Sequence, residues 1–280
     1  MSLGALSHML RERTGIVRHA LGRRTVGGSF SAFAKNLLRP PYTVLGRRKI
    51  ERVEQNGEFQ LIYIKDFDRP LAYPAGYNLL HIEMVLMEQL YPWQWHHYSH
   101  GGTRVEPGEV ILDCGCAEGV FPFLHARTAK QVVGIEPLPD FQKCLARTFK
   151  DTPNVQIVPV AIGDQPGTAY IRSEVGNSMI VTTPTPFPVQ IDTIDNICTR
   201  LNLPVTYLKA DMEGFEVAAL RGARETIRKH KPKIAMTTYH DPAHAEQMAA
   251  IVRECHPGYH IEFKGIVGEA GHPFMMHAWC

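Results

Sequence analysis

Long apolar runs are absent from this 280-residue chain. No stretch approaches the roughly 20 consecutive apolar residues that a membrane-spanning helix needs, and no apolar run near the start resembles a signal-peptide core. Cysteine is also scarce. The six cysteines are scattered along the chain and lack the dense spacing of a secreted disulfide scaffold. These absences predict reduced thiols and a cytoplasmic protein that is soluble or at most peripheral to a membrane.

Acidic residues are nearly missing from the first 50 positions. This segment holds ten Lys or Arg against one acid, Glu12, for a net charge of +9, whereas the remainder holds 20 bases and 27 acids, for a net of −7. Three interpretations stay open: a solvated arm folded over an acidic body, an organellar transit sequence, and an arm whose residues 1–50 contact an anionic membrane surface or partner. Because the basic charge is confined to this arm, we do not expect a nucleic-acid partner.

The pattern of charged, aromatic and apolar residues divides the chain into three parts. Residues 1–60 form a basic N-terminal extension, residues 61–108 form a helical and aromatic lead-in, and residues 109–280 form the main domain. In the main domain, short β-rich runs alternate with helix-like segments, which is typical of a parallel sheet with helices on both faces. Strands are predicted at 110–113, 131–136, 155–160, 206–210 and 233–239, with a closing hairpin at 259–263 and 274–279. Helices are predicted at 121–128, 140–149, 192–201, 213–231 and 243–255, and a polar insertion at 163–188 contains one strand at 169–172.

Glycines and acids fall at the ends of the predicted strands, where open α/β sheets bind their ligands. Gly115 and Gly119 follow the first strand and allow a ligand to approach the backbone N–H groups closely. Asp113 closes that strand, and Glu136 ends the second strand 23 positions later, where a carboxylate can accept hydrogen bonds from ribose hydroxyls. The turn lacks the Gly-x-Gly-x-x-Gly spacing of a dinucleotide site, and acids such as Glu118 repel a pyrophosphate but favour a cationic sulfonium. We therefore predict S-adenosylmethionine (SAM), rather than a nicotinamide, as the cofactor.

Six segments, in order along residues 109–240, together resemble the FkbM-type SAM-dependent methyltransferases. They are Asp113-Cys-Gly-Cys-Ala-Glu-Gly119, Gly134-Ile-Glu136-Pro137, Val160-Ala-Ile-Gly-Asp164, Thr193-Ile-Asp195-Asn-Ile197, Leu208-Lys-Ala-Asp-Met-Glu-Gly-Phe-Glu216 and Tyr239-His240. The resemblance implies a class I, Rossmann-like α/β fold for residues 109–280, with a doubly wound, mostly parallel seven-stranded sheet and helices on both faces. It also implies in-line methyl transfer, generally to a hydroxyl oxygen of a sugar, lipid or secondary metabolite, with S-adenosylhomocysteine (SAH) as the product.

The resemblance also assigns cofactor residues. Asp113, Gly115 and Glu136 match the family's SAM-contact positions, and Ala161 falls where such folds line the adenine. We assign the rest of the turn to the cofactor as well, namely Cys116, Glu118 and Gly119.

Methyl transfer to a hydroxyl benefits from a general base. Asp211 ends the fourth strand and His240 follows the fifth, so both are candidate catalytic residues, although each could instead cap the helix that follows. An oxygen-ligated divalent cation held by Asp211, Glu213 and Glu216 stays an alternative, but we assign no metal, because acids that open a helix need none to explain them.

The aromatic stretch 91–100 lies just before the main domain. Its side chains, including Trp93 and Trp95, could cover the acceptor site or simply pack against the sheet. The alternative to an enzyme is a non-catalytic module that keeps the SAM fold as a scaffold or binds a membrane surface. The Asn/Asp-Pro-Pro-aromatic motif of base methylation is absent after the fourth strand, which also argues against a nucleic-acid substrate.

Overall fold

The structure is a computed structural model that describes residues 3–21, 30–172, 179–181, 183–268 and 270–280. Two bases of the N-terminal arm, Arg23 and Arg24, lie outside the described residues. Within the described part of the chain, no helix combines the length and apolarity that crossing a bilayer requires.

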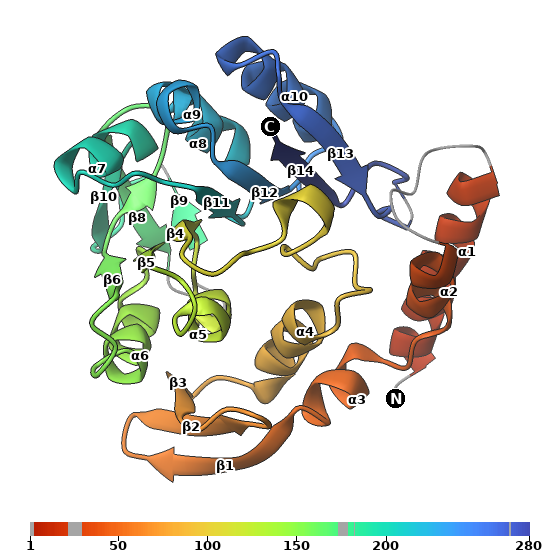
Figure 1. Cartoon of the computed structure of the whole chain (residues 1–280). Coiled ribbons are helices and arrows are strands. Elements are labelled where there is room, and N and C mark those ends of the chain that lie inside the picture. The colour runs from red at the N-terminus through yellow and green to blue at the C-terminus, as the bar shows by residue number, and fades with distance from the viewer. Residues whose placement is uncertain (1–2, 22–29, 173–178, 182, 269) are drawn as a thin grey trace.

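A seven-stranded sheet forms the main domain, in the order β13-β14-β12-β11-β4-β5-β6 (Figure 1). Its strands are β4 (Val110–Cys114), β5 (Gln131–Ile135), β6 (Val155–Val158), β11 (Tyr207–Ala210), β12 (Lys233–Thr237), β13 (His260–Lys264) and β14 (Met275–Trp279). Neighbouring strands from β6 to β12 pair in parallel, and β14 pairs antiparallel with both β12 and β13. The chain builds outward from β4 to β6 and then returns to β11, so the strand order reverses beside β4, where such sheets bind ligands. The predicted fold class and the closing hairpin are confirmed.

Apolar residues on consecutive positions of β4 explain why this strand is buried on both faces. Val110 and Leu112 pack into a cluster with the helices that follow β10, whereas Ile111 packs on the other face with Phe121 and Tyr207. Burying one such aliphatic side chain contributes about 1.5–3 kcal/mol. The continuous apolar run is therefore the sequence signal of a central parallel strand.

The helices of the main domain follow the predicted alternation. They are α5 (Val120–His125), α6 (Pro139–Thr148), α7 (Ile194–Arg200), α8 (Glu216–Arg221), α9 (Arg224–His230) and α10 (His244–Cys255). The single helix predicted over 213–231 is wrong, because α8 ends at Arg221, where Gly222 caps it, and α9 begins at Arg224. The carbonyl of Gly222 accepts a hydrogen bond from the Asp195 N–H at 2.8 Å, so this break joins α8 to the start of α7.

The N-terminal part combines helices with a small sheet. It contains α1 (Leu3–Leu21), α2 (Phe30–Leu38), α3 (Tyr42–Arg47), β1 (Ile50–Asn56), β2 (Phe59–Ile64), β3 (Pro70–Pro74), α4 (Leu79–Leu90) and the 3-10 turn η1 (Gly101–Thr103). The helical extension is as predicted, but no strand was predicted in 50–74. The hairpin of β1 and β2 closes at Gly57, where φ is 63°. Asn56 pairs with Phe59, so Gly57 and Glu58 form the two-residue loop of this hairpin. The boundary predicted after residue 60 falls within β2.

The three-stranded sheet β1-β2-β3 packs on α6. Leu61 and Ala72 contact the buried Cys144, and the Thr148 hydroxyl accepts a hydrogen bond from the Ala72 N–H at 2.9 Å. A second small sheet, β7-β10-β8-β9, occupies the predicted insertion. Its strands are β7 (Ala161–Ile162), β8 (Gly167–Arg172), β9 (Met179–Val181) and β10 (Pro188–Asp192), so the strand predicted at 169–172 is part of a larger element.

Candidate active site

The glycine-rich turn after β4 depends on backbone angles that favour glycine. Gly115 has a φ of 72°, Ala117 of 45° and Gly119 of 82°. A Cβ atom on Gly115 would lie 2.0 Å from the Asp211 carbonyl oxygen, so the turn and the loop after β11 touch through their backbones. A Cβ atom on Gly119 would lie 2.4 Å from a Leu145 methyl group, which brings α6 against the turn. Both glycines therefore permit close packing at the carboxyl ends of the strands.

Glu136 binds this turn to the end of β5. Its buried carboxylate accepts hydrogen bonds from the N–H groups of Ala117 and Leu138, each at 2.8 Å. Burial raises the pKa of Glu136 to about 7, although the two N–H groups act in the opposite direction. Each carboxylate oxygen keeps a second lone pair, so the group can still accept a ribose hydroxyl.

Asp113 helps to hold the glycine-rich turn through Lys209. Its side chain is fully buried, and its Oδ1 lies 2.8 Å from the Lys209 ammonium, which also donates to the Gly115 carbonyl at 2.8 Å. Burial alone would lower the pKa of Lys209, but the charge of Asp113 raises it, so Lys209 keeps its proton at neutral pH. Burial raises the pKa of Asp113, and the charge of Lys209 acts against this rise. The described role of Asp113 is to hold the turn, and its direct contact with a cofactor stays a prediction.

The other residues assigned to the cofactor lie around the same edge. Glu118 is buried, and its Oε2 lies 3.3 Å from Nε2 of His81 on α4, which raises the pKa of His81 to about 8. The Cys116 side chain is buried where a Cβ on Gly134 would come within 2.9 Å of its sulfur, so Cys116 offers its backbone rather than its thiol. Ala161 lies in β7, buried against Leu138 just after the end of β5.

Asp211 lies at the end of β11 and is surrounded by donors from two segments, residues 96–98 and residues 237–239. Its Oδ2 accepts a hydrogen bond from the Tyr98 hydroxyl at 2.8 Å and lies 3.1 Å from Nε2 of His96. Its Oδ1 accepts hydrogen bonds from the Thr237 hydroxyl at 3.2 Å and the Tyr239 hydroxyl at 3.4 Å. About 19% of the Asp211 side chain is accessible, so the carboxylate can still meet a substrate.

A second carboxylate extends this network. Nδ1 of His96 lies 3.1 Å from Oε1 of Glu88, so the ring sits between two acids. Burial alone would lower the pKa of His96, but Glu88 and Asp211 raise it to about 9. Burial alone would raise the pKa of Asp211, but the bond to His96 and its charge hold it well below the usual range. At neutral pH the site therefore holds a carboxylate at Asp211 beside an imidazolium at His96.

His240 lies near Asp211, with Glu216 beside both, and its predicted catalytic role stays a prediction. One ring nitrogen lies 3.2 Å from Glu213 Oε2 and the other 3.3 Å from Oε1 of the fully buried Glu216. Burial alone would lower the pKa of His240, but these acids raise it to about 10. The Glu216 oxygen that faces His240 also accepts the Met212 N–H at 2.8 Å, so Glu216 organises the loop after β11.

The same cluster bears on the metal alternative. Asp211, Glu216 and His240 each offer one ligand atom within 4.8 Å of the others, whereas the Glu213 side chain is 88% exposed. The Thr237 hydroxyl lies 3.2 Å from both Asp211 Oδ1 and Glu216 Oε1, so hydrogen bonds and a protonated His240 account for this arrangement. The predicted ligand set of Asp211, Glu213 and Glu216 therefore differs from the group that the structure brings together.

The aromatic stretch 91–100 contributes to the site through residues that the sequence analysis did not select. Trp95 is buried in a cluster with Ile16 and Ile266, which favours the packing interpretation for that ring. His96 and Tyr98 are the members that reach Asp211. The density of histidine and tyrosine just before the first central strand was the available signal, but nothing in the sequence pairs these residues with a carboxylate more than 110 positions away.

Comparison with solved structures supports the fold. The FkbM methyltransferase of Methylobacillus flagellatus KT is 20% identical to the chain, with 70% of this chain and 54% of that protein covered and a TM-score of 0.51. The chain thus spans about half the length of that protein. Two further matches are the SAM-bound fibrillarin of Aeropyrum pernix (12% identity, 82% and 99% covered, TM-score 0.43) and the putative methyltransferase SMU.1697c of Streptococcus mutans with bound SAH (10% identity, 62% and 90% covered, TM-score 0.42).

A search among curated proteins gives no match to the chain. The model of the methyltransferase FkbM domain matches residues 113–261, which is more than half of the sequence and includes the glycine-rich turn, Glu136, Asp211 and His240. The chain therefore belongs to the FkbM methyltransferase family.

Proposed function

We propose that this chain transfers the methyl group of SAM to a hydroxyl of a sugar, lipid or secondary-metabolite acceptor. One observation carries the proposal: the glycine-rich turn after β4 contacts both Glu136 and the loop that holds Asp211. Gly115 abuts the Asp211 backbone, while the Ala117 N–H binds Glu136. A cofactor held on this turn would therefore lie within reach of Asp211.

The residues of the turn suit SAM. Bound SAM would supply a methyl group on a positively charged sulfur and would leave as SAH. Glu136 would accept the ribose hydroxyls, the backbone of residues 115–119 would approach the cofactor, and Ala161 would border the adenine. The acidic Glu118 adds favourable potential for a cationic ligand, since opposite charges attract more strongly where water is excluded.

Asp211 is the proton acceptor in this proposal. Its low pKa keeps it ionised at every working pH, so it can accept a hydrogen bond from the substrate hydroxyl and orient the oxygen for in-line attack. As the oxygen gains its new bond to carbon, its proton becomes acidic and passes to Asp211. His240 carries its own proton at neutral pH, so we assign it a positioning role, in which it fixes the loop through Glu216.

The cofactor assignment is tested by calorimetric titration of the full chain with SAH. We expect micromolar binding, no comparable binding of NADH, and a loss of at least about 10-fold for Glu136→Ala, because a hydrogen bond to a charged group contributes about 1.5–3 kcal/mol. Glu225→Ala removes an acid that is 76% exposed on α9 and serves as the matched control. Failure to bind SAH, or a preference for NADH, would overturn the cofactor assignment.

The catalytic assignment is tested with Asp211→Asn and His240→Gln against a panel of hydroxyl-bearing sugars and lipids. We expect Asp211→Asn to lower kcat by about 100-fold or more while SAH affinity stays within threefold, as for the loss of a general base. His240→Gln should have a smaller effect. Full turnover by Asp211→Asn would refute the assignment, and SAH binding without turnover of any acceptor would favour the scaffold alternative.

A further inference from the structure

The outward face of the N-terminal helices exposes large apolar side chains. Leu21 at the end of α1 is 80% exposed, Phe30 at the start of α2 is 84% exposed, and Leu38 at its end is 76% exposed. These are the highest exposures among the large apolar side chains of the described residues. A concentration of such side chains on two adjacent helices marks a surface that contacts something apolar.

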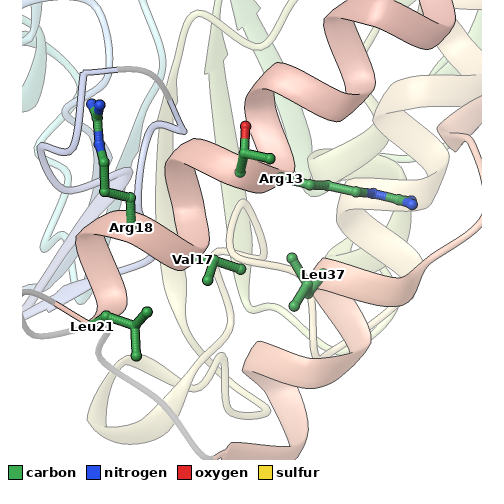
Figure 2. A pocket seen from close by; sticks show the side chains of 6 residues that line it. Arg13, Val17, Arg18, Leu21 and Leu37 are labelled. Atoms are coloured by element: carbon green, nitrogen blue, oxygen red, sulfur yellow. The ribbon is translucent and has the colours of Figure 1, made fainter.

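A groove between α1 and α2 continues this face (Figure 2). Its lining residues are Arg13, Thr14, Val17, Arg18, Leu21 and Leu37. Val17, Leu21 and Leu37 project into the space between the helices, whereas the Arg18 side chain points away from it and Arg13 reaches across to donate to the Arg39 carbonyl. The groove is therefore lined by aliphatic side chains, with two arginines at its border.

The opposite face of α1 fixes the two helices to the body. Ile16 is buried with Trp95 and Ile266, and Phe33 and Leu37 of α2 pack against the same cluster. Because side chains three and four positions apart share one face of a helix, Val17 and Leu21 form a second, outward stripe. Because the stripe that includes Ile16 packs on the body of the protein, the stripe of Val17 and Leu21 stays available to a partner.

Charge identifies the partner. Arg18 and Lys35 are exposed on these two helices, and no acidic side chain is exposed among the described side chains of residues 11–21 and 30–48. A second copy of the chain would bring together two segments that each carry a net +9. An anionic lipid surface would instead gain about 1 kcal/mol for each basic residue near it and would also take up the apolar side chains.

We propose that the outward face of α1 and α2 docks onto an anionic lipid surface. Leu21, Phe30 and Leu38 enter the interface between headgroups and acyl chains, while Arg18 and Lys35 contact the lipid headgroups. The proposal does not depend on the proposed function, because none of these side chains touches the candidate active site.

Flotation of the full chain with vesicles tests the proposal. The vesicles are phosphatidylcholine alone or phosphatidylcholine with about 30% phosphatidylserine, at about 0.1 M salt, where charge screening is moderate. We expect flotation with the anionic vesicles only. Both Leu21→Ser/Leu38→Ser and Arg18→Glu/Lys35→Glu should weaken it by about 10-fold or more, from lost apolar burial in the first case and reversed charge in the second.

Leu80→Ser/Phe187→Ser is the matched control, because it removes two apolar side chains, 47% and 57% exposed, that lie outside this face. The control should float like the wild type, and circular dichroism should show that all variants are folded. Three results would overturn the proposal: no flotation with anionic vesicles, equal flotation with uncharged vesicles, or equal loss in the control. Dimerisation without vesicles that Leu21→Ser/Leu38→Ser abolishes would assign the face to a second copy instead.

Discussion

Asp211 and His96 form an ion pair that is largely removed from water. A carboxylate in such a place is costly unless opposite charge and hydrogen bonds compensate it, and here the imidazolium, Tyr98, Thr237 and Tyr239 all do so. These four groups fix the position of the Asp211 carboxylate before any substrate arrives. Such preorganisation is what an acceptor hydroxyl requires for in-line attack.

His96→Gln should change the pH dependence of stability. The pKa of His96 is raised to about 9 in the folded chain, so its contribution is full below the unfolded value of 6.5 and is lost as pH rises to about 9. With about 1.4 kcal/mol per pKa unit, the contribution is on the order of 3 kcal/mol. In urea unfolding, the variant should be less stable than the wild type by about this amount at pH 6, and the gap should narrow towards pH 9.

His230→Gln, at the end of α9, is the control for this measurement. Burial lowers the pKa of His230, so its ring is neutral in both the folded and the unfolded chain above about pH 7.5. The free energy of unfolding of this variant relative to the wild type should therefore be constant from about pH 7.5 to 9. A gap for His96→Gln that is equally constant would contradict the ionised state that we assign to His96.

Single residues were predicted unevenly from the sequence. Glu136, Asp211 and Gly115 could be proposed as site residues because each lies at or just after the end of a predicted strand. His96, Glu88 and Lys209 could not, because their roles come from contacts between distant segments, and those contacts exist only once the sheet has formed. Lys209 lies within the motif that carried the family resemblance, yet only the structure shows that it holds Asp113 and Gly115.

At the scale of elements, the turn after β4 and the loop after β11 are joined through one glycine. Gly115→Ala would place a Cβ atom 2.0 Å from the Asp211 carbonyl oxygen, in addition to the cost of a positive φ. We expect a loss of more than about 2 kcal/mol in the free energy of unfolding, since both a backbone clash and a strained conformation contribute. SAH affinity should fall as well, because the shifted turn no longer presents its N–H groups correctly.

Gly57→Ala separates the two contributions. Gly57 has a similar φ of 63°, but nothing lies within 4 Å of the position that its Cβ would occupy. This variant should lose only about 1–2 kcal/mol, the cost of the left-handed conformation, and should leave SAH affinity unchanged. Equal destabilisation of the two variants would show that the loops are not in close contact.

Helices and strands could be predicted where the local sequence pattern agrees with the burial that the folded structure imposes. The five parallel strands lie within a few residues of their predicted positions, because central strands need continuous apolar sequence. The small sheet at 50–74 was missed because β1 is largely exposed and has no continuous apolar run, although Gly57 and the apolar run of β2 that follows it marked the hairpin. The break between α8 and α9 was missed because Gly222 is set by its contact with the start of α7.

For the whole molecule, the segment before residue 109 completes the candidate active site. His81 reaches Glu118 from α4, and Glu88, His96 and Tyr98 form the network around Asp211. This segment therefore supplies charged and hydrogen-bonding groups to the site, and its role as a cover over the acceptor stays a prediction. In Figure 1, α1 and α2 lie at the opposite side of the molecule from β6 and α6.

The position of β14 has a consequence for how the chain is made. Residues 275–279 lie between β12 and β13, and β13 has no other neighbour in the sheet. During synthesis, β13 therefore leaves the ribosome before the strand that must hold it, with Ile261 and Phe263 not yet packed against the core. Native pairing at this edge must wait for β14, so we expect the sheet to close only after residues 275–279 have been made, and the nascent chain to expose an unpaired strand until then.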